Sequence, residues 1–147
     1  MKKKLLISAC LLGVGCRYDG GRVKKVDVER LGEAFDLVPI CPEIYGGLPT
    51  PRTPSERVGD RVVMKDGRDV TDNFIRGAEH TLMIAEATGA KLALLKARSP
   101  SCGKGEVYDG SFSGTLTAGD GFTSERLKAS GIEVFTELEY EALMAKK

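Results

Sequence analysis

Short apolar runs alternate along the chain with segments whose apolar residues recur at helical spacing. Residues 4–9, KLLISA, form an apolar run of the kind found in a strand that is covered on both faces. From Asp27 to Phe35 the apolar residues fall on one side of a helix, so we predict a short helix there. The run Leu37–Ile40 predicts a second strand, although Pro39 cannot donate a hydrogen bond to a central ladder.

The strongest helical pattern extends from Thr71 to Thr88. One face of this segment is apolar, at Phe74, Ala78, Leu82 and Ala85. Thr71 or Asp72 can cap its start, and Gly89 can end it.

The second half of the chain continues the alternation. Residues 91–96 enclose the run LALL, which predicts a third buried strand, and a loop rich in glycine and serine then extends to about residue 121. A helix opened by Thr123 or Ser124 and closed by Gly131 should follow. We place this helix, a fourth strand and a terminal helix at residues 123–129, Ile132–Phe135 and Glu137–Met144.

Two irregular stretches interrupt this alternation. Between Arg61 and Val70, Asp66-Gly67 separates two strand-like runs, which predicts a small β-hairpin. Residues 46–57, GGLPTPRTPSER, contain three prolines. We interpret them as a stiff surface connection, with a functional lid as the alternative.

Alternating strands and helices indicate the α/β class. We predict a Rossmann-like open, mainly parallel sheet of about four strands flanked by helices, with the hairpin as an insertion. The 147 residues correspond to one ordinary domain, spanning residues 1–147.

Composition excludes a membrane-spanning helix, and the charge argues against a nucleic-acid-binding protein. No apolar run approaches the roughly 20 residues that a membrane-spanning helix needs. The 22 Lys and Arg against 21 Asp and Glu give a net charge of +1, so the basic surface of a nucleic-acid-binding protein is missing.

The first ten residues, MKKKLLISAC, have some features of a secretion signal. Only Leu5 and Leu6 precede the possible cleavage box Ile7–Cys10, too little apolar chain for export. We therefore favour a buried strand and a cytoplasmic location, where thiols stay reduced.

Three of the four cysteines follow predicted strands. Cys10 comes after the first strand, Cys41 after the second, and Cys102 in the loop after the third. Because the carboxyl ends of parallel strands share one edge of a sheet, we expect these thiols to converge. Nearby glycines would let the backbone approach a bulky inorganic group.

Several uses of such thiols remain open. Structural disulfides need an oxidising compartment, for which the sequence gives no evidence. Structural zinc prefers close pairs such as Cys-x-x-Cys, which do not occur. Scattered cysteines suit an iron–sulfur cluster. Three ligands would leave one iron open to a soft sulfur atom, whereas four would give an inert or electron-transfer site.

Three motifs together resemble a known family. SACLLGVGCRYDGG near the start, CPE after the second strand and RSPSCG after the third are similar to the motifs of the thiouracil desulfidases, once catalogued as a domain of unknown function. The resemblance covers essentially the whole chain. It implies a Rossmann-like fold and an oxygen-sensitive [4Fe-4S] cluster. It also implies hydrolytic removal of sulfur from 2-thiouracil, with the substrate sulfur on the open iron, to give uracil and sulfide.

The same resemblance implies the site residues. Carried over by motif, the cluster ligands are Cys10, Cys41 and Cys102. Cys16 also belongs to the first motif, but it lies a loop away from the strand, and we place it outside the ligand set.

Hydrolysis of a thiocarbonyl needs a base to activate water and an acid to protonate a ring nitrogen or the leaving group. Glu43, two residues after Cys41, is the first candidate, and Ser101 could orient water or substrate. Asp19, in YDGG, is the third. Each has an ordinary alternative: a solvated or helix-capping glutamate, a serine that satisfies turn backbone, and a turn aspartate. His80 is the only histidine and is interpreted as a structural or surface residue of the long helix.

Two other functions remain open. A sulfur-transfer enzyme could use the same cluster on thiolated nucleosides or tRNA, although the near-neutral charge argues against tRNA. A non-catalytic domain could bind zinc through four thiolates. The expected partner is a small thiolated pyrimidine, and the residue pattern specifies no oligomeric state.

Overall fold

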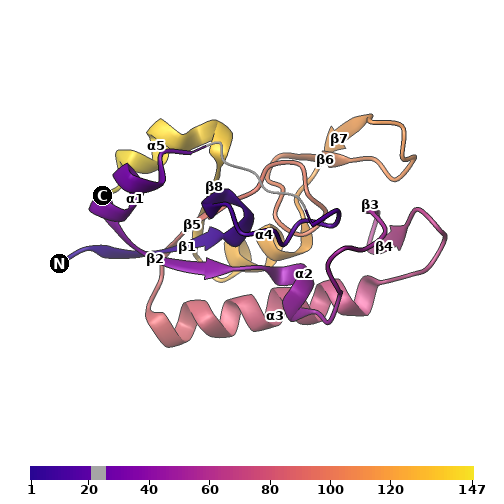
Figure 1. Ribbon diagram of the computed structural model, residues 1–147, viewed down its shortest axis with the longest axis horizontal. Coiled ribbons are helices and arrows are strands. Elements are labelled where there is room, and N and C mark those ends of the chain that lie inside the picture. The colour runs from indigo at the N-terminus through magenta and orange to yellow at the C-terminus, as the bar shows by residue number, and fades with distance from the viewer. Residues whose placement is uncertain (21–25) are drawn as a thin grey trace.

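A four-stranded parallel sheet forms the centre of the molecule, in the order β2-β1-β5-β8 (Figure 1). The computed structural model describes residues 1–20 and 26–147. The sheet strands are β1 (Lys3–Ser8), β2 (Phe35–Ile40), β5 (Leu92–Leu95) and β8 (Glu133–Thr136). The predicted α/β class with four parallel strands is confirmed.

The segment that has features of a secretion signal contains a central strand, β1, which is exposed at Lys3 and Lys4 and buried from Leu5 to Ser8. β1 lies between β2 and β5, and Leu5, Leu6 and Ile7 have no exposed surface. Its side chains enter two different cores. Leu5 and Ile7 pack with helices on one face of the sheet, and Leu6 packs with helices on the other.

Helices cover both faces of the sheet. On one face lie α1 (Val28–Ala34) and α5 (Tyr140–Met144), and on the other lie α3 (Thr71–Thr88) and α4 (Phe122–Ala129). Figure 1 shows α1 and α5 above the strands and α3 below them. The predicted terminal helix is divided into a 3₁₀ turn, η2 (Glu137–Glu139), and α5.

Pro39 is tolerated because β2 is an edge strand. An edge strand has no second neighbouring strand, so the missing N–H of Pro39 removes no hydrogen bond there, and this is the position where sheets accept proline.

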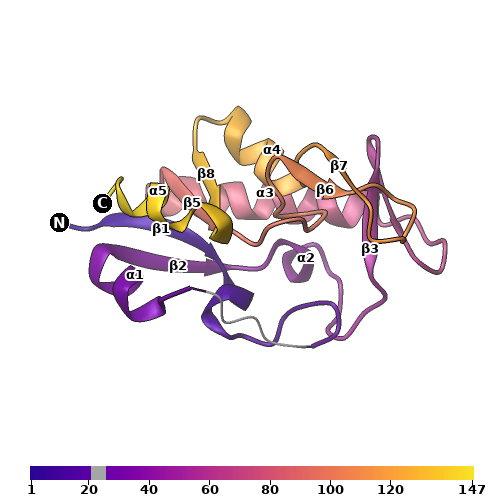
Figure 2. The ribbon, with the colours of Figure 1, turned by 90° about the horizontal axis from the view of Figure 1, so that it is seen from above.

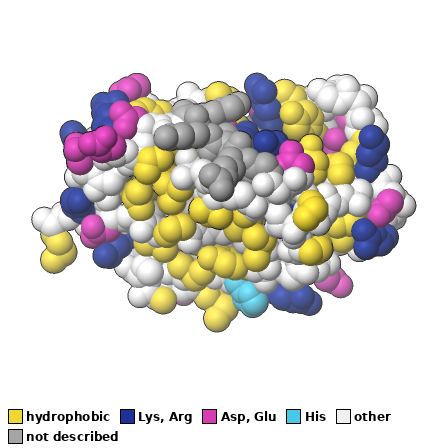
Figure 3. Space-filling model, in the orientation of Figure 1, with side chains coloured by type: hydrophobic (Ala, Val, Ile, Leu, Met, Phe, Trp, Pro, Cys, Tyr) yellow, Lys and Arg dark blue, Asp and Glu magenta, His cyan; other side chains and the backbone are white. Residues whose placement is uncertain are grey.

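Figure 3 shows apolar side chains gathered over β2 and α3 on this side of the molecule.

The long helix has its predicted bounds but not its predicted cap. Gly89 ends α3 in the left-handed conformation, with φ of +75°. Val70 occupies the N-cap position and makes no side-chain cap, and the Asp69 carboxylate accepts the Thr71 N–H at 2.9 Å. The Thr71 hydroxyl instead accepts a hydrogen bond from the Val62 N–H at 2.9 Å. The predicted capping side chain therefore binds the backbone of the preceding strand.

The start of α4 also differs from the prediction. Gly121 occupies the N-cap position, and neither Thr123 nor Ser124 caps the helix. Both side chains are buried, and the Ser124 hydroxyl donates to the Cys102 carbonyl oxygen at 2.8 Å. Ser124 therefore fixes a cysteine loop rather than a helix end.

Two antiparallel hairpins lie outside the main sheet. They are formed by β3 (Ser55–Val58) with β4 (Arg61–Met64), and by β6 (Glu106–Tyr108) with β7 (Leu116–Ala118). The predicted hairpin is present. The chain turns at Asp66-Gly67, the Met64 N–H donates to the Arg68 carbonyl oxygen at 2.8 Å, and Val63 pairs with Asp69. The sequence analysis missed β3, which is the longer antiparallel partner of β4. In the described residues, no helix is long and apolar enough to cross a membrane.

Candidate functional site

The four cysteines meet at the carboxyl end of the sheet. They line one cavity of about 710 Å³. Cys10 lies in η1 (Ala9–Leu12), directly after β1, and Cys41 lies between β2 and α2 (Pro42–Tyr45). Cys102 lies in the loop after β5. Its sulfur accepts a hydrogen bond from the Ser8 hydroxyl, with 3.4 Å between Oγ and Sγ. The structure thus brings together thiols that are distant in the chain.

All four thiols are free, and three are buried. Burial raises the pKa of Cys102 from 9.0 to about 12, and hydrogen bonds from Ser8 and Ser101 lower it only in part. The Cys16 thiol lies close to those of Cys10 and Cys41. The contact with Cys10 raises the pKa of Cys16, and the contact with Cys16 raises the pKa of Cys41. Ligation by a metal would have to displace these protons.

The donor set fits an iron–sulfur cluster better than a single zinc ion. A zinc ion needs its donors about 2.3 Å from one point. Among residues 1–20 and 26–147, no three histidine, cysteine or carboxylate groups are arranged to hold one ion. Thiols without a histidine, distributed around a cavity, match a cluster that brings its own bridging sulfides.

Glu43 is fixed at the cavity wall through both carboxylate oxygens. It lies in the first turn of α2, two residues after Cys41, and its side chain is 16% exposed. Oε2 accepts from the Ser101 hydroxyl at 3.0 Å. Oε1 accepts from Nε and Nη2 of Arg52 at 3.1 and 3.0 Å. Two of the predicted catalytic residues therefore contact each other directly.

The hydrogen bonds around Ser101 define the direction of its proton. Ser99 Oγ accepts the backbone N–H groups of Ser101 and Cys102 at 3.1 and 2.9 Å. With its acceptor sites filled, the Ser99 hydroxyl donates to Ser101 Oγ at 2.9 Å. Ser101 in turn donates to Glu43, so a chain of hydroxyls ends at the carboxylate.

Arg52 is the residue of this site that the sequence analysis missed. Its side chain is only 4% exposed and also donates to the carbonyl oxygens of Cys16 and Pro49, at 3.2 and 3.0 Å. The proline-rich stretch 46–57 therefore carries a buried cation into the cavity wall, and it is more than a surface connection. The one signal for it in the sequence is a lone arginine among three prolines.

Comparison with known proteins now identifies the family. The model of the 2-thiouracil desulfurase family matches residues 5–139. The chain belongs to this family. A solved structure described as a [4Fe-4S]-dependent thiouracil desulfidase, TudS, is 46% identical with a TM-score of 0.94, and the match covers 99% of this chain and 97% of that one. The uncharacterized protein YbbK of Bacillus subtilis (strain 168) is 37% identical over 150 residues, covering 95% of this chain and 99% of YbbK.

Family membership confirms the resemblance seen in the three motifs. Not every predicted residue reaches the cavity, however. Asp19 is exposed in a turn where the Gly20 N–H donates to the Arg17 carbonyl oxygen at 2.8 Å, and it is not among the described residues that line the cavity. His80 is an exposed residue of α3.

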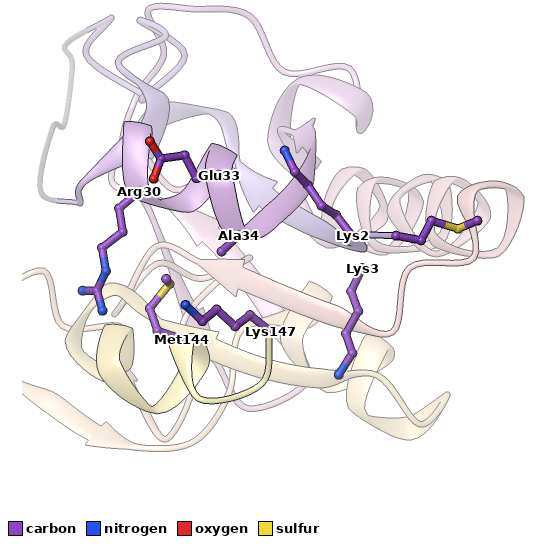
Figure 4. Close-up of a pocket in the computed structure, with 8 residues that line it drawn as sticks. Lys2, Lys3, Arg30, Glu33, Ala34, Met144 and Lys147 are labelled. Atoms are coloured by element: carbon purple, nitrogen blue, oxygen red, sulfur yellow. The ribbon is translucent and has the colours of Figure 1, made fainter.

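A second hollow, of about 600 Å³, lies at the opposite end of β1. Its lining includes Lys2, Lys3, Arg30 and Lys147. Figure 4 shows that the charged ends of these side chains point in different directions. Lys2 and Lys3 donate to carbonyl oxygens of Gly32 and Lys146, at 2.7 and 2.6 Å. The free thiols line only the cavity at the other end of the sheet, among the residues that the structure describes.

Proposed function

We propose that this protein is a [4Fe-4S]-dependent desulfidase that removes the sulfur of 2-thiouracil, or of a related thiolated pyrimidine, as sulfide and leaves uracil. The observation that supports this most directly is the Glu43 carboxylate, held between Arg52 and Ser101 in the same cavity as four free thiols. The family match and the similarity to TudS support the same function.

The residues that would hold the cluster are Cys10, Cys41 and Cys102. They lie in the segments that follow three neighbouring strands, β1, β2 and β5. When bound, a cluster with three protein ligands supplies an open iron, a soft Lewis acid that favours the thiocarbonyl sulfur. Ser8 donates to Cys102 Sγ at 3.4 Å, so it also stabilises the thiolate that ligation requires.

Glu43 is the general base in this proposal. A carboxylate has about four acceptor sites, and one site of Oε2 remains after the bond from Ser101. A water bound there loses a proton to Glu43 as its oxygen attacks carbon 2 of the pyrimidine. The proton then passes to the departing sulfur or a ring nitrogen, and the balance is C=S + H₂O giving C=O + H₂S.

Arg52 and Ser101 are positioning residues for this base. The guanidinium binds Oε1 through two N–H groups, which fixes the plane of the carboxylate. The Ser101 hydroxyl fixes the other oxygen. Both interactions are made with the ionised form of Glu43, which is the form that can accept a proton.

The size of the cavity and the charge of the chain favour a small substrate. A volume of about 710 Å³ lies within the range of small-molecule sites. A net charge of +1 gives no support to tRNA as the partner. We place the enzyme in the cytoplasm, where cysteine ligands stay reduced.

The test is to purify the protein anaerobically and measure iron and acid-labile sulfide per chain. The loss of the thiocarbonyl absorbance of 2-thiouracil and the release of sulfide are then followed. About four irons with turnover would support the proposal. Four irons without turnover would overturn this substrate, and zinc bound by the thiols would favour a binding domain instead.

A further inference from the structure

Aromatic side chains line the same cavity as the cysteines. They are Tyr18, Tyr108 and Phe112, and the hydrolysis proposed above uses none of them. Tyr108 ends β6, and Phe112 lies in the β6–β7 turn, outside the central sheet. Aromatic rings recognise the flat face of a heterocyclic base by stacking.

Phe112 has an unusual backbone conformation. Its φ of +57° lies in the left-handed region, which a bulky residue rarely adopts. Such a conformation persists where the surrounding structure fixes it, and it often occurs at ligand-binding positions. The position of this ring at the cavity wall is therefore imposed by its neighbours.

The neighbour that fixes the turn is Glu56 of β3. Its side chain is largely buried, with 9% of the residue exposed. Glu56 Oε1 accepts the backbone N–H groups of Gly110 and Phe112, at 2.9 and 3.1 Å. A buried carboxylate is costly unless it is hydrogen-bonded, so these two bonds hold the turn against β3.

The turn is also tightly packed against β3. A Cβ atom at Gly110 would lie 2.4 Å from Cγ2 of Val58, so only glycine fits there without displacing the turn. Within the turn, the Asp109 N–H donates to the Thr115 carbonyl oxygen at 3.0 Å. Figures 1 and 2 both show the β6–β7 hairpin beside β3.

We propose that Phe112 is a substrate-binding residue, on whose ring the flat heteroaromatic ring of the thiolated substrate stacks. Glu56 is the positioning residue that presents it. This inference rests on the proposed function for the identity of the substrate. It assigns the preference for a substrate with an aromatic ring to the β6–β7 hairpin, whereas the thiols and Glu43 act on the C=S bond.

The first test compares Phe112→Ala with wild-type holoenzyme. Stacking on a base predicts that KM for 2-thiouracil rises about tenfold while kcat changes far less. The Kd for uracil, measured anaerobically by calorimetry, should rise by the same factor, and Phe112→Tyr should restore both. Unchanged iron content would show that the variant is folded. Wild-type KM and Kd in Phe112→Ala would overturn the proposal.

A second comparison separates ring binding from the chemistry of the C=S bond. Thiourea has the same thiocarbonyl but no aromatic ring. In Phe112→Ala, the ratio of kcat/KM for 2-thiouracil to that for thiourea should fall about tenfold. An equal loss of kcat/KM for both compounds would show that Phe112 does not bind the pyrimidine ring.

Glu56 is tested through its effect on Phe112. Glu56→Ala should weaken uracil binding as much as Phe112→Ala, whereas Glu56→Gln, which keeps one accepting oxygen, should restore it. In the double variant of Glu56→Ala with Phe112→Ala, the two losses should not add, because both remove the same interaction. Additive losses would contradict the positioning role.

These measurements distinguish failure of this inference from failure of the proposed function. If wild-type protein binds uracil but does not turn over 2-thiouracil, hydrolysis is overturned and the binding test of Phe112 still stands. If it turns over 2-thiouracil and Phe112→Ala has wild-type constants, only the inference is overturned. If it neither binds uracil nor turns over 2-thiouracil, both are overturned.

Discussion

The Glu43 carboxylate has almost no freedom of orientation. Arg52 binds one oxygen and Ser101 the other, and Arg52 is itself 4% exposed. A base fixed in this way needs no reorganisation when a water molecule binds. The same fixation makes the residue sensitive to substitution, because an amide can accept on only one side.

We expect Glu43→Gln to lower kcat at least a hundredfold, since a positioned base contributes about that much. Iron content should not change, because Glu43 is not one of the proposed ligands. The measurement is anaerobic turnover of 2-thiouracil together with iron per chain. Glu133→Gln, an exposed glutamate on β8, is the matched control and should retain full activity. A Glu43→Gln enzyme with wild-type kcat would assign the base to another group.

Substitution of each cysteine in turn distinguishes the thiols that hold iron from those that do not. Alanine at Cys10, Cys41 or Cys102 should reduce iron well below four per chain, because each removes one proposed ligand. Cys16→Ala should retain about four irons, although its thiol contacts those of Cys10 and Cys41. Loss of iron in Cys16→Ala would make Cys16 a ligand.

The cluster-free protein should show the raised pKa of Cys102 directly. Its pKa of about 12, against 9.0 for an ordinary thiol, lowers the thiolate fraction about a thousandfold at pH 8. Alkylation of Cys102 should be correspondingly slow in the folded apo-protein and fast in urea, as measured by mass spectrometry.

The same shift predicts how apo-protein stability depends on pH. Above pH 9 the unfolded thiol ionises while the folded one keeps its proton, so the free energy of unfolding falls as pH rises. Alkylation of Cys102 at equal rates in folded and unfolded protein would contradict both expectations.

At the scale of elements, α2 is held by backbone contact with α3. A Cβ atom at Gly77 would lie 2.0 Å from the Pro42 carbonyl oxygen, and one at Gly46 would lie 2.0 Å from that of Asn73. Cys41 and Glu43 flank Pro42, so a side chain that pushed α2 away from α3 would also displace these two residues. The glycines therefore determine the position of a proposed ligand and of the proposed base.

Gly77→Ala should lower the melting temperature by about 5 °C or more and reduce the iron content, because a methyl group must be forced between two backbones. Gly32→Ala is the control, since no atom lies within 4 Å of the Cβ position at Gly32. Thermal unfolding and iron analysis measure both effects. Equal stability of the two variants would show that α2 can shift freely.

The elements that the sequence predicts well are those with long or uninterrupted patterns. The bounds of α3 follow from its apolar face and Gly89, and β1 follows from its apolar run. β3 was missed because it follows three prolines and has only four residues. The caps at Thr71 and Ser124 were wrong because both hydroxyls bind backbone from distant segments.

At the scale of the whole molecule, the convergence of the cysteines follows from the parallel sheet. Strands β1, β2 and β5 are neighbours, so residues just after them must share an edge. Arg52 and Phe112 reach the same cavity through irregular chain, whose path no periodic pattern encodes, and Glu56 reaches it from the short strand β3. The sequence therefore predicts where the proposed cluster lies, but not what surrounds the substrate.

The hydrogen bond between Ser8 and Cys102 joins positions 94 residues apart in the chain. A growing polypeptide that has reached only the end of β5 still lacks Cys102. It therefore lacks one thiol of the proposed ligand set, whatever has already folded. In the cell, delivery of iron and sulfide must then wait until more than two thirds of the protein has been made, which makes maturation a late event of biosynthesis.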